Sequence, residues 1–392
     1  MNLRTSSTRV DSFSESMIRE MTRLADRHGA VNLAQGYPDF PAPTLIKDAA
    51  CRAIQDDVNQ YSITWGATSL RQALAANYRR RYGMDLDPET QICVTCGSTE
   101  GMIAAILGLA NPGDEIIVFE PFYENYAPDA KLAGATLRYV QLHPPHWDFD
   151  EAELRSAFSD RTRAIVINSP HNPTGKVFSR SELQVIAELC QSYDAIALAD
   201  EIYEHIVYGG AVHIPIATIP GMAARTVTIS SISKSYSVTG WRVGWTVASP
   251  ELTNSIRKVH DFLTVGAPSP LQEAAAVALA MPDSYYDDLA AGYAKRRALM
   301  SQLLAAVGLP HELPQGAYYI LADVRPLGWG DDLASARRLV ETGRVAAVPG
   351  SSFYAKRGTC MGSGQLRFAF SKSLATLQQA GERLARLNRT AK

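Results

Sequence analysis

The sequence has little cysteine, no long apolar run and almost no net charge. Its 392 residues include five cysteines, an odd and sparse number that fits a reducing cytoplasm better than a disulfide scaffold. The first residues lack the apolar core of a signal peptide, and no apolar run is long enough to cross a bilayer. The formal net charge of -2 gives no reason to expect nucleic acid or a membrane as partner. We therefore expect a cytoplasmic protein.

What the sequence does contain is an alternation of strand and helix patterns. Apolar, β-branched runs near residues 115–119, 163–168, 195–199 and 226–230 read as strands separated by helices. This alternation predicts an open α/β sheet with its sites at the carboxyl ends of the strands. Cys93 and Cys96 have the spacing of a metal motif, but residues three apart on a strand point to opposite faces, so we predict no metal site.

The stretch from Ser231 to Gly244 carries the most specific signal. It follows the predicted strand at residues 226–230 and contains Lys234 and Arg242 among small and hydroxylated residues. A lysine just past a buried strand is desolvated, which lowers its pKa and makes it an amine that can form a Schiff base. Ser231 and Arg242 suit a phosphate dianion. A reactive lysine beside a phosphate site indicates pyridoxal phosphate.

Ser-x-x-Lys followed by Thr-Gly-Trp-Arg-x-Gly resembles the cofactor-lysine signature of the class I/II aminotransferases, the fold-type I pyridoxal-phosphate enzymes. Within that family the chain most resembles the kynurenine, aromatic and methionine aminotransferases. The resemblance implies an α/β fold whose large domain, residues 46–285, holds the cofactor on a mostly parallel seven-stranded sheet. Residues 1–45 and 286–392 would form a smaller α+β domain, joined to the first by a long helix that starts near Asp283.

Two further segments suit this cofactor, one as an anion site for its phosphate and the other as a carboxylate for its ring nitrogen. Gly97, Ser98 and Thr99 form a glycine turn opening a helix, whose free backbone N–H groups would complete a phosphate cup. Asp200 follows an apolar strand, where an isolated carboxylate is costly unless it has a partner. A protonated pyridine nitrogen would be that partner, and we expect the neighbouring Glu201 to be solvated.

The resemblance implies the remaining roles residue by residue. Arg367, in an otherwise apolar strand, would clamp the substrate α-carboxylate, because a buried arginine needs an anion. The Gly36 backbone and Tyr37 would contact the substrate. Asn172 and Tyr203 would hydrogen-bond to the phenolic oxygen of the cofactor, and Tyr123 would stack on its pyridine ring. Tyr61 would reach the phosphate of a neighbouring subunit, which implies a homodimer with shared active sites.

The expected reaction moves the amino group of an L-amino acid to a 2-oxo acid. Lys234 would hold the cofactor as an aldimine and then act as general base and acid. The expected pocket residues are neutral or aromatic, which favours aromatic or other neutral donors over aspartate: Tyr37, Trp65, Thr99, Tyr123, Tyr203 and Tyr319. A cation outside these motifs, such as Arg4, Arg9 or Lys356, could change that preference.

Four other functions stay open on the sequence alone. The same fold and cofactor support β-elimination or amino-acid oxidation. Ser231-x-x-Lys234 also fits a serine acyl-enzyme, with Tyr123 and Asn125 resembling its Tyr-x-Asn element, although no Lys-Thr-Gly follows. A non-enzymatic regulator on an inactive aminotransferase fold would need a DNA-binding extension, and the residues before Val31 are too few and not basic.

Overall fold

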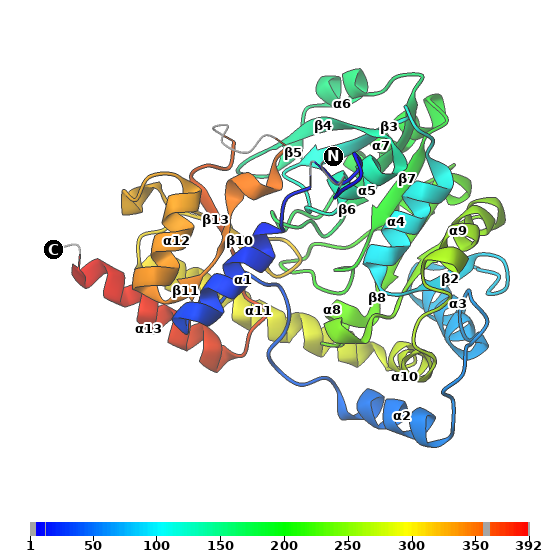
Figure 1. Cartoon of the computed structure of the whole chain (residues 1–392), viewed down its shortest axis with the longest axis horizontal. Coiled ribbons are helices and arrows are strands. Elements are labelled where there is room, and N and C mark those ends of the chain that lie inside the picture. Colours follow the sequence, from blue (N-terminus) through cyan, green and yellow to red (C-terminus); the bar gives the residue numbers. More distant parts are fainter. Residues whose placement is uncertain (1–4, 12, 356–360, 391–392) are drawn as a thin grey trace.

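The chain folds around a central sheet, seen on the right of Figure 1. The computed structural model describes residues 5–11, 13–355 and 361–390. Within these residues the sheet has eight strands in the order β2-β9-β8-β7-β6-β3-β4-β5. Its strands are β2 (Ile92–Thr95), β3 (Glu115–Glu120), β4 (Thr136–His143), β5 (Asp148–Phe149), β6 (Thr162–Asn168), β7 (Ile196–Asp200), β8 (Thr226–Ser231) and β9 (Gly244–Val247).

The middle of this sheet is parallel, as the alternation of strands and helices predicts. Neighbours from β8 through β7, β6 and β3 to β4 run in the same direction, whereas β9, β2 and β5 are antiparallel to their partners. The seven strands expected from the family resemblance become eight because the two residues of β5 pair with Leu142 and His143 at the end of β4. So short a strand has no periodicity that a sequence could reveal.

Helices cover both faces of the sheet, which is why its central strands β3, β6 and β7 are mainly apolar. Alternate residues of β3, β6 and β7 enter two different cores, one packed against α6 and α7 and the other against α4, α5 and α9. These helices and their neighbours are α2 (Thr44–Gln55), α3 (Thr68–Tyr82), α4 (Ser98–Leu109), α5 (Tyr126–Ala133), α6 (Glu151–Ala157), α7 (Arg180–Ser192), α8 (Ile232–Ser235), α9 (Pro250–Leu263) and α10 (Ser269–Leu279).

A second group of elements, on the left of Figure 1, surrounds its own core. In it, β10-β13-β12 form an antiparallel sheet and β1 pairs in parallel with β11. The elements are α1 (Met17–His28), β1 (Val31–Asn32), β10 (Tyr319–Asp323), α12 (Asp332–Gly343), β11 (Val345–Ala346), β12 (Val348–Pro349), β13 (Gln365–Ala369) and α13 (Leu374–Thr390). Short 3₁₀ helices lie at Ile216–Thr218, Ala223–Arg225, Thr239–Trp241, Arg325–Leu327 and Gly350–Phe353.

The long helix α11 (Asp283–Ala306) contributes to both groups. Tyr286 near its start packs in a core with α3, α10 and β9, whereas Tyr293, Met300 and Leu304 pack in the core of the second group. We therefore keep as a proposal the division into a large domain at residues 46–285 and a small domain at residues 1–45 and 286–392. No helix in the described part of the chain is both long and apolar enough to cross a membrane.

Candidate active site

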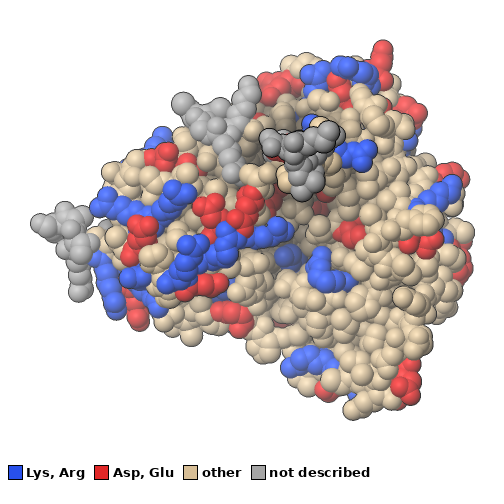
Figure 2. Space-filling model, in the orientation of Figure 1, with Lys and Arg blue, Asp and Glu red and all other residues tan. Residues whose placement is uncertain are grey.

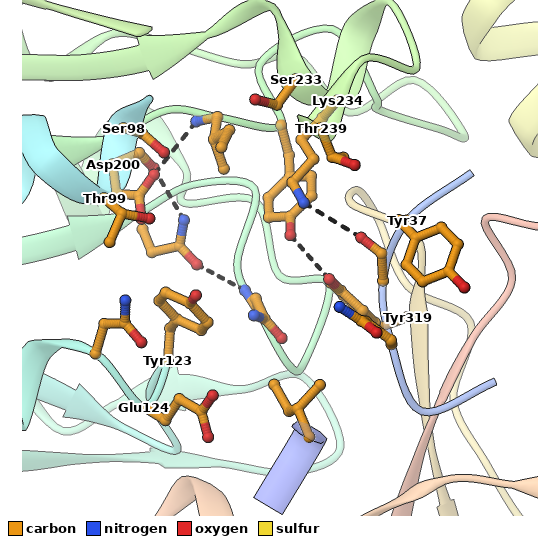
Figure 3. Close-up of a pocket in the computed structure, with 18 of the residues that line it drawn as sticks. Tyr37, Ser98, Thr99, Tyr123, Glu124, Asp200, Ser233, Lys234, Thr239 and Tyr319 are labelled. Carbon is orange, nitrogen blue, oxygen red and sulfur yellow. Dashed lines mark hydrogen bonds between the residues drawn. The ribbon is translucent and has the colours of Figure 1, made fainter. Parts of the chain in front are cut away.

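A cavity of about 490 Å³ lies where the central sheet meets the second group of elements. Asn168 ends β6, Asp200 ends β7, and Lys234 follows β8 by one helical turn. Since parallel strands end at the same edge of a sheet, these three side chains line one cavity. Figure 3 shows Lys234 and Asp200 facing Tyr37 and Tyr319 across it.

Lys234 lies deep in this cavity without a carboxylate in direct contact. Its Nζ donates a hydrogen bond to the carbonyl oxygen of Gly36 at 3.2 Å, and no described carboxylate lies within ion-pair distance of it. Burial, together with the positive charges of Arg242 and Arg367 and against the opposing effect of Asp200, lowers the pKa of Lys234 to about 8. At neutral pH a minor but much enlarged fraction of this amine is therefore unprotonated and nucleophilic.

Asp200 is buried at the end of its apolar strand, as the sequence predicts. Burial raises its pKa to about 6, while a hydrogen bond from Tyr126 and the charge of Lys234 oppose that rise. The Tyr126 hydroxyl donates to Oδ2 at 2.6 Å, which holds the carboxylate in one orientation. An anion so placed is suited to a protonated ring nitrogen, whose charge would also favour the ionised carboxylate.

Arg367 is a buried cation at the opposite wall, with a side chain 1% exposed. Its Nη1 donates to Asn172 Oδ1 at 2.8 Å and its Nη2 to the carbonyl of Ala34 at 2.7 Å. Its Nε has no partner, and no described carboxylate lies within ion-pair distance. The ring of Tyr319 lies 4.2 Å from its guanidinium carbon. A buried, uncompensated guanidinium is a site for a carboxylate ligand.

The start of α4 and Arg242 form a second anion site. Gly97 precedes α4 with φ of 80°, a value that favours glycine, and Ser98 and Thr99 open the helix with free N–H groups. Arg242 donates to the carbonyls of Thr239 and Cys96. A Cβ added to Gly97 would lie 2.1 Å from Arg242 Nη2, so only glycine leaves this cradle open. The cradle, the amine and the buried carboxylate together fit pyridoxal phosphate.

The comparison with known families agrees with this geometry. The family described as aminotransferase class I and II matches residues 28–384. The chain belongs to the class I and II aminotransferases. Enzymes of this class depend on pyridoxal phosphate, so this chain is a pyridoxal-phosphate-dependent aminotransferase. That assignment decides against the serine acyl-enzyme and against a non-enzymatic regulator.

Individual relatives cover almost the whole aminotransferase. The probable N-succinyldiaminopimelate aminotransferase DapC of Mycobacterium tuberculosis is 40% identical over 386 residues, which are 96% of this chain and 97% of the relative. Kynurenine–oxoglutarate transaminase 3 of Rattus norvegicus is 36% identical over 95% and 88% of the two chains. The structure of YbdL from Escherichia coli, described as having a methionine aminotransferase function, superposes with a TM-score of 0.93 at 33% identity, covering 97% and 99%.

Most residues that the sequence singled out for the aminotransferase site line the cavity together. They are Gly36, Tyr37, Ser98, Thr99, Tyr123, Asn172, Asp200, Tyr203, Lys234, Arg242, Tyr319 and Arg367. Tyr203 and Tyr319 hydrogen-bond to each other through their hydroxyls at 2.9 Å. A Cβ on Gly36 would lie 2.1 Å from the Tyr319 hydroxyl, so the close backbone approach requires glycine.

Four of the expected residues lie outside the cavity wall. Gly97 and Trp65 are not part of it. The Ser231 hydroxyl accepts a hydrogen bond from the N–H of Ser233 at 3.1 Å, and it is Ser233 that lines the wall. Tyr61 is 87% exposed on the surface.

Sequence reasoning missed other members of the wall. Arg19 and Glu124 line it as well, although neither lies in a position that the motifs indicated. Of the cations named beforehand, Arg9 is not part of the wall, and Arg4 and Lys356 lie outside the described residues. In the sequence, Arg19 is an isolated arginine on an amphipathic helix, a pattern that predicts a solvated side chain. Only the fold shows that the start of α1 lines the cavity.

The expectation that Glu201 is solvated is wrong. Its side chain is buried, and Oε2 lies 3.2 Å from His213 Nε2. The negative charges of Glu201 and Glu204 raise the pKa of His213 against the opposing effect of its burial. The pair thus favours a proton on His213, and a protonated His213 would compensate the buried carboxylate. His213 lies twelve residues further along the chain, and nothing in the local pattern shows that the two meet.

Proposed function

We propose that this aminotransferase moves the amino group of an L-amino acid with a neutral, preferably aromatic, side chain to a 2-oxo acid. One observation carries the proposal: an uncompensated Arg367, a lysine of lowered pKa and a ring-partner carboxylate line the same cavity. The guanidinium suits an α-carboxylate, and the lysine suits proton transfer at the adjacent carbon.

The proposed roles follow from these positions. Arg367 and Asn172 bind the α-carboxylate, and the close approach of Gly36 leaves room for it. Lys234 Nζ takes the proton from the α-carbon and later returns it, which its pKa of about 8 permits near neutral pH. Asp200 would keep the ring nitrogen of a bound cofactor protonated. When bound, pyridoxal phosphate supplies the electron sink for the carbon that loses its proton.

The preference for neutral side chains rests on the walls of the cavity. Tyr37, Tyr123 and Tyr319 line it with aromatic surface, and Ile18 adds an aliphatic side chain from α1. Rings and thioethers gain by burial against such walls, whereas these three tyrosines and Ile18 offer no cation to a short carboxylate held among them. The names of two relatives, which mention kynurenine and methionine, support a neutral donor.

Steady-state kinetics with one common 2-oxo acid tests this preference. We expect kcat/KM for phenylalanine or methionine to exceed that for aspartate. A preference for aspartate of roughly tenfold, equivalent to about 1.4 kcal/mol, would contradict the proposal. The products should be a new amino acid and a new 2-oxo acid in equal amounts. Ammonia release without a new amino acid would instead indicate β-elimination or oxidation.

We also propose a homodimer with shared active sites. The loop that carries Tyr61 is held by α10, because Ser269 Oγ donates to the carbonyl of Gln60 at 2.6 Å and accepts from the N–H of Ser62. This ordered loop presents Tyr61 outward, and Phe262 at the end of α9 is 90% exposed. Val58 and Ile63, which flank Tyr61 in the sequence, and Leu263 and Val265, which follow Phe262, are exposed as well, and apolar side chains gathered in a patch mark interaction surfaces. They support a contact through which Tyr61 reaches the cofactor phosphate of a second copy.

Location in the cytoplasm remains part of the proposal. Cys51, Cys93, Cys96 and Cys190 are free in the described part of the chain, which supports a reducing compartment.

A further inference from the structure

His260 is a fully buried histidine on α9, and both of its ring nitrogens face oxygen atoms. Nε2 lies 2.7 Å from the carbonyl oxygen of Thr64, and Nδ1 lies 2.9 Å and 3.0 Å from the two carboxylate oxygens of Glu100. A carbonyl oxygen only accepts, so Nε2 carries a hydrogen. Two lone pairs would meet at Nδ1 unless a proton lies there as well, since the Thr264 hydroxyl at 3.4 Å is farther away than either carboxylate oxygen. Because imidazole is more basic than a carboxylate, the geometry describes an imidazolium that donates to both partners.

Glu100 connects this histidine with the phosphate cradle. It lies in the first turn of α4, and its Oε2 accepts the N–H of Cys96 at 2.9 Å. The carbonyl of Cys96 accepts in turn from Arg242, the cation of the cradle. The residue before Gly97 is therefore held from one side by the buried pair and from the other by the cradle arginine.

Thr64 belongs to the loop that presents Tyr61 on the surface. Ser269 and Gln272 of α10 anchor this loop through hydrogen bonds to its backbone. The bond from His260 to Thr64 is a further anchor, and it ties the loop to α9 and α4, which lie side by side in Figure 1. One imidazole thus joins the Tyr61 loop to the helix whose start forms the cradle.

An uncompensated negative charge in the first turn of α4 would oppose a phosphate. The N–H groups at this helix start face the site of a phosphate dianion, and Glu100 lies in the same turn. A protonated His260 compensates that carboxylate, so the pair is neutral overall. Loss of the proton would leave Glu100 uncompensated near the dianion and would turn Nδ1 from a donor into an acceptor. Both changes would weaken the cradle.

The groups around His260 favour its protonated form in spite of its burial. Burial acts to lower the pKa of His260, but the hydrogen bond and negative charge of Glu100 and the carbonyl of Thr64 outweigh this effect, so the pKa is raised above 6.5. The negative charge of Asp261, the next residue of α9, acts in the same direction.

Other titratable groups near the pair keep their charge in the range where His260 titrates. They are Arg242 beside the cradle, Arg257 on α9, and the thiols of Cys93 and Cys96. Burial raises the pKa of Cys93 to about 12 and raises that of Cys96 above 9.0, and arginine stays protonated. His260 is therefore the member of this cluster that changes its charge between about pH 7 and about pH 9.

We propose that His260 is a positioning residue for the cofactor phosphate: its imidazolium compensates Glu100 and fixes the start of α4 against the loop that carries Tyr61. His260 does not line the cavity, which opens in the hollow at the centre of Figure 2, so it acts through the cradle and touches no substrate. In the proposed homodimer, the same hydrogen bonds link the cradle of one subunit with the loop that serves the cofactor of the other. That last link rests on the proposed function.

The test isolates the phosphate by comparing two forms of the cofactor. Pyridoxal phosphate and pyridoxal, which lacks the phosphate, are titrated into the full-length apoenzyme from about pH 7 to about pH 9, where the phosphate is a dianion. Both react with Lys234, so the titration of that amine cancels in the dissociation constant of pyridoxal divided by that of pyridoxal phosphate. This phosphate ratio measures the cradle. The variants are His260→Gln, Glu100→Gln, their double variant and His213→Gln, a matched control that removes another buried histidine beside a glutamate.

In the wild-type protein we expect the phosphate ratio to fall about tenfold as the pH rises, because the contribution of a group whose pKa is raised by folding is lost above that pKa. His260→Gln should show the low ratio at every pH, since its Glu100 is never compensated. Glu100→Gln should keep the high ratio at every pH, since it has no charge to compensate. The double variant should regain most of what His260→Gln loses, and His213→Gln should follow the wild type.

Nuclear magnetic resonance of isotopically labelled histidine gives a second readout, which does not depend on binding. The signals that disappear in His260→Gln should show hydrogens on both ring nitrogens near pH 7 in the wild type and on one in Glu100→Gln. Glu100→Gln keeps the shape of its side chain, so it tests the inference even if His260→Gln does not fold.

A wild-type phosphate ratio that stays constant up to about pH 9 would overturn the inference. So would a double variant no better than His260→Gln, because a purely structural role is not relieved by removing the charge of Glu100. A single hydrogen on the wild-type ring near pH 7 would overturn it as well. Failure of the proposed homodimer would appear separately, as a monomer whose phosphate ratio still falls with pH.

Discussion

The lowered pKa of Lys234 predicts how fast the apoenzyme reacts with an aldehyde at each pH. Burial, with Arg242 and Arg367, brings this pKa from 10.5 to about 8. At pH 7 the neutral amine is then roughly 9% of the total, against roughly 0.03% for an ordinary lysine. The reactive fraction is therefore about 300 times larger. It should rise with pH through a midpoint near 8 and level off above it.

Rapid mixing of apoenzyme with pyridoxal, which lacks the phosphate, measures this rate without involving the phosphate cradle. The Schiff base absorbance gives the rate, and Lys234→Ala gives the background from other lysines. Arg242→Gln removes a cation that disfavours the ammonium, so the midpoint should move up. Asp200→Asn removes an anion that favours the ammonium, so the midpoint should move down.

A midpoint at 10 or above in the wild-type apoenzyme would refute the reasoning. Shifts of the same sign in Arg242→Gln and Asp200→Asn would also refute it, because the two charges act on the Lys234 ammonium in opposite directions.

Three more predictions concern the cofactor and the dimer. Asp200→Ala should lower kcat/KM on the order of 10²–10³-fold and Asp200→Glu less, and a fully active alanine variant would remove Asp200 from the site. Gly97→Ala should weaken cofactor binding in equilibrium dialysis, because the added Cβ would meet Arg242. Gly113→Ala, which is also at positive φ but in open space, should not weaken it. Equal cofactor affinities in the two variants would contradict the assignment of Gly97 to the phosphate cradle. Phe262→Asp should yield an inactive monomer by mass in dilute solution, and a wild-type protein that is an active monomer would contradict the shared site.

The motifs predicted many of the cavity residues because those residues lie at a strand end or a helix start. Asp200 follows a purely apolar strand, and Gly97 precedes an apolar helix, so short segments already show a polar group at the edge of a buried layer. The strand order of an open parallel sheet then brings such edges together. Physical reasoning on local segments is sufficient for residues of this kind.

The residues that escaped prediction owe their roles to contacts between distant segments. Tyr126 orients Asp200 from 74 positions away, and its aromatic ring reads as an ordinary core residue. Arg19 lies on a helix whose polar face gives no sign of the cavity beside it. Glu201 follows a functional carboxylate, and its burial depends on His213. Each of these contacts requires the packing of separate elements, which no local pattern contains.

The pairing of β1 with β11 affects the order in which the chain can fold as it is synthesised. Val31 can pair with Val345 only after nearly the whole chain has been synthesised. The strands of the central sheet, in contrast, all lie between Ile92 and Val247. The sheet can therefore assemble while α1 and β1 still lack partners, since domains generally fold as units during synthesis. A ribosome-bound chain would thus offer the lysine and the phosphate cradle before Arg367 exists. Cofactor capture could precede substrate recognition, and an arrested nascent chain would acquire the first ability without the second.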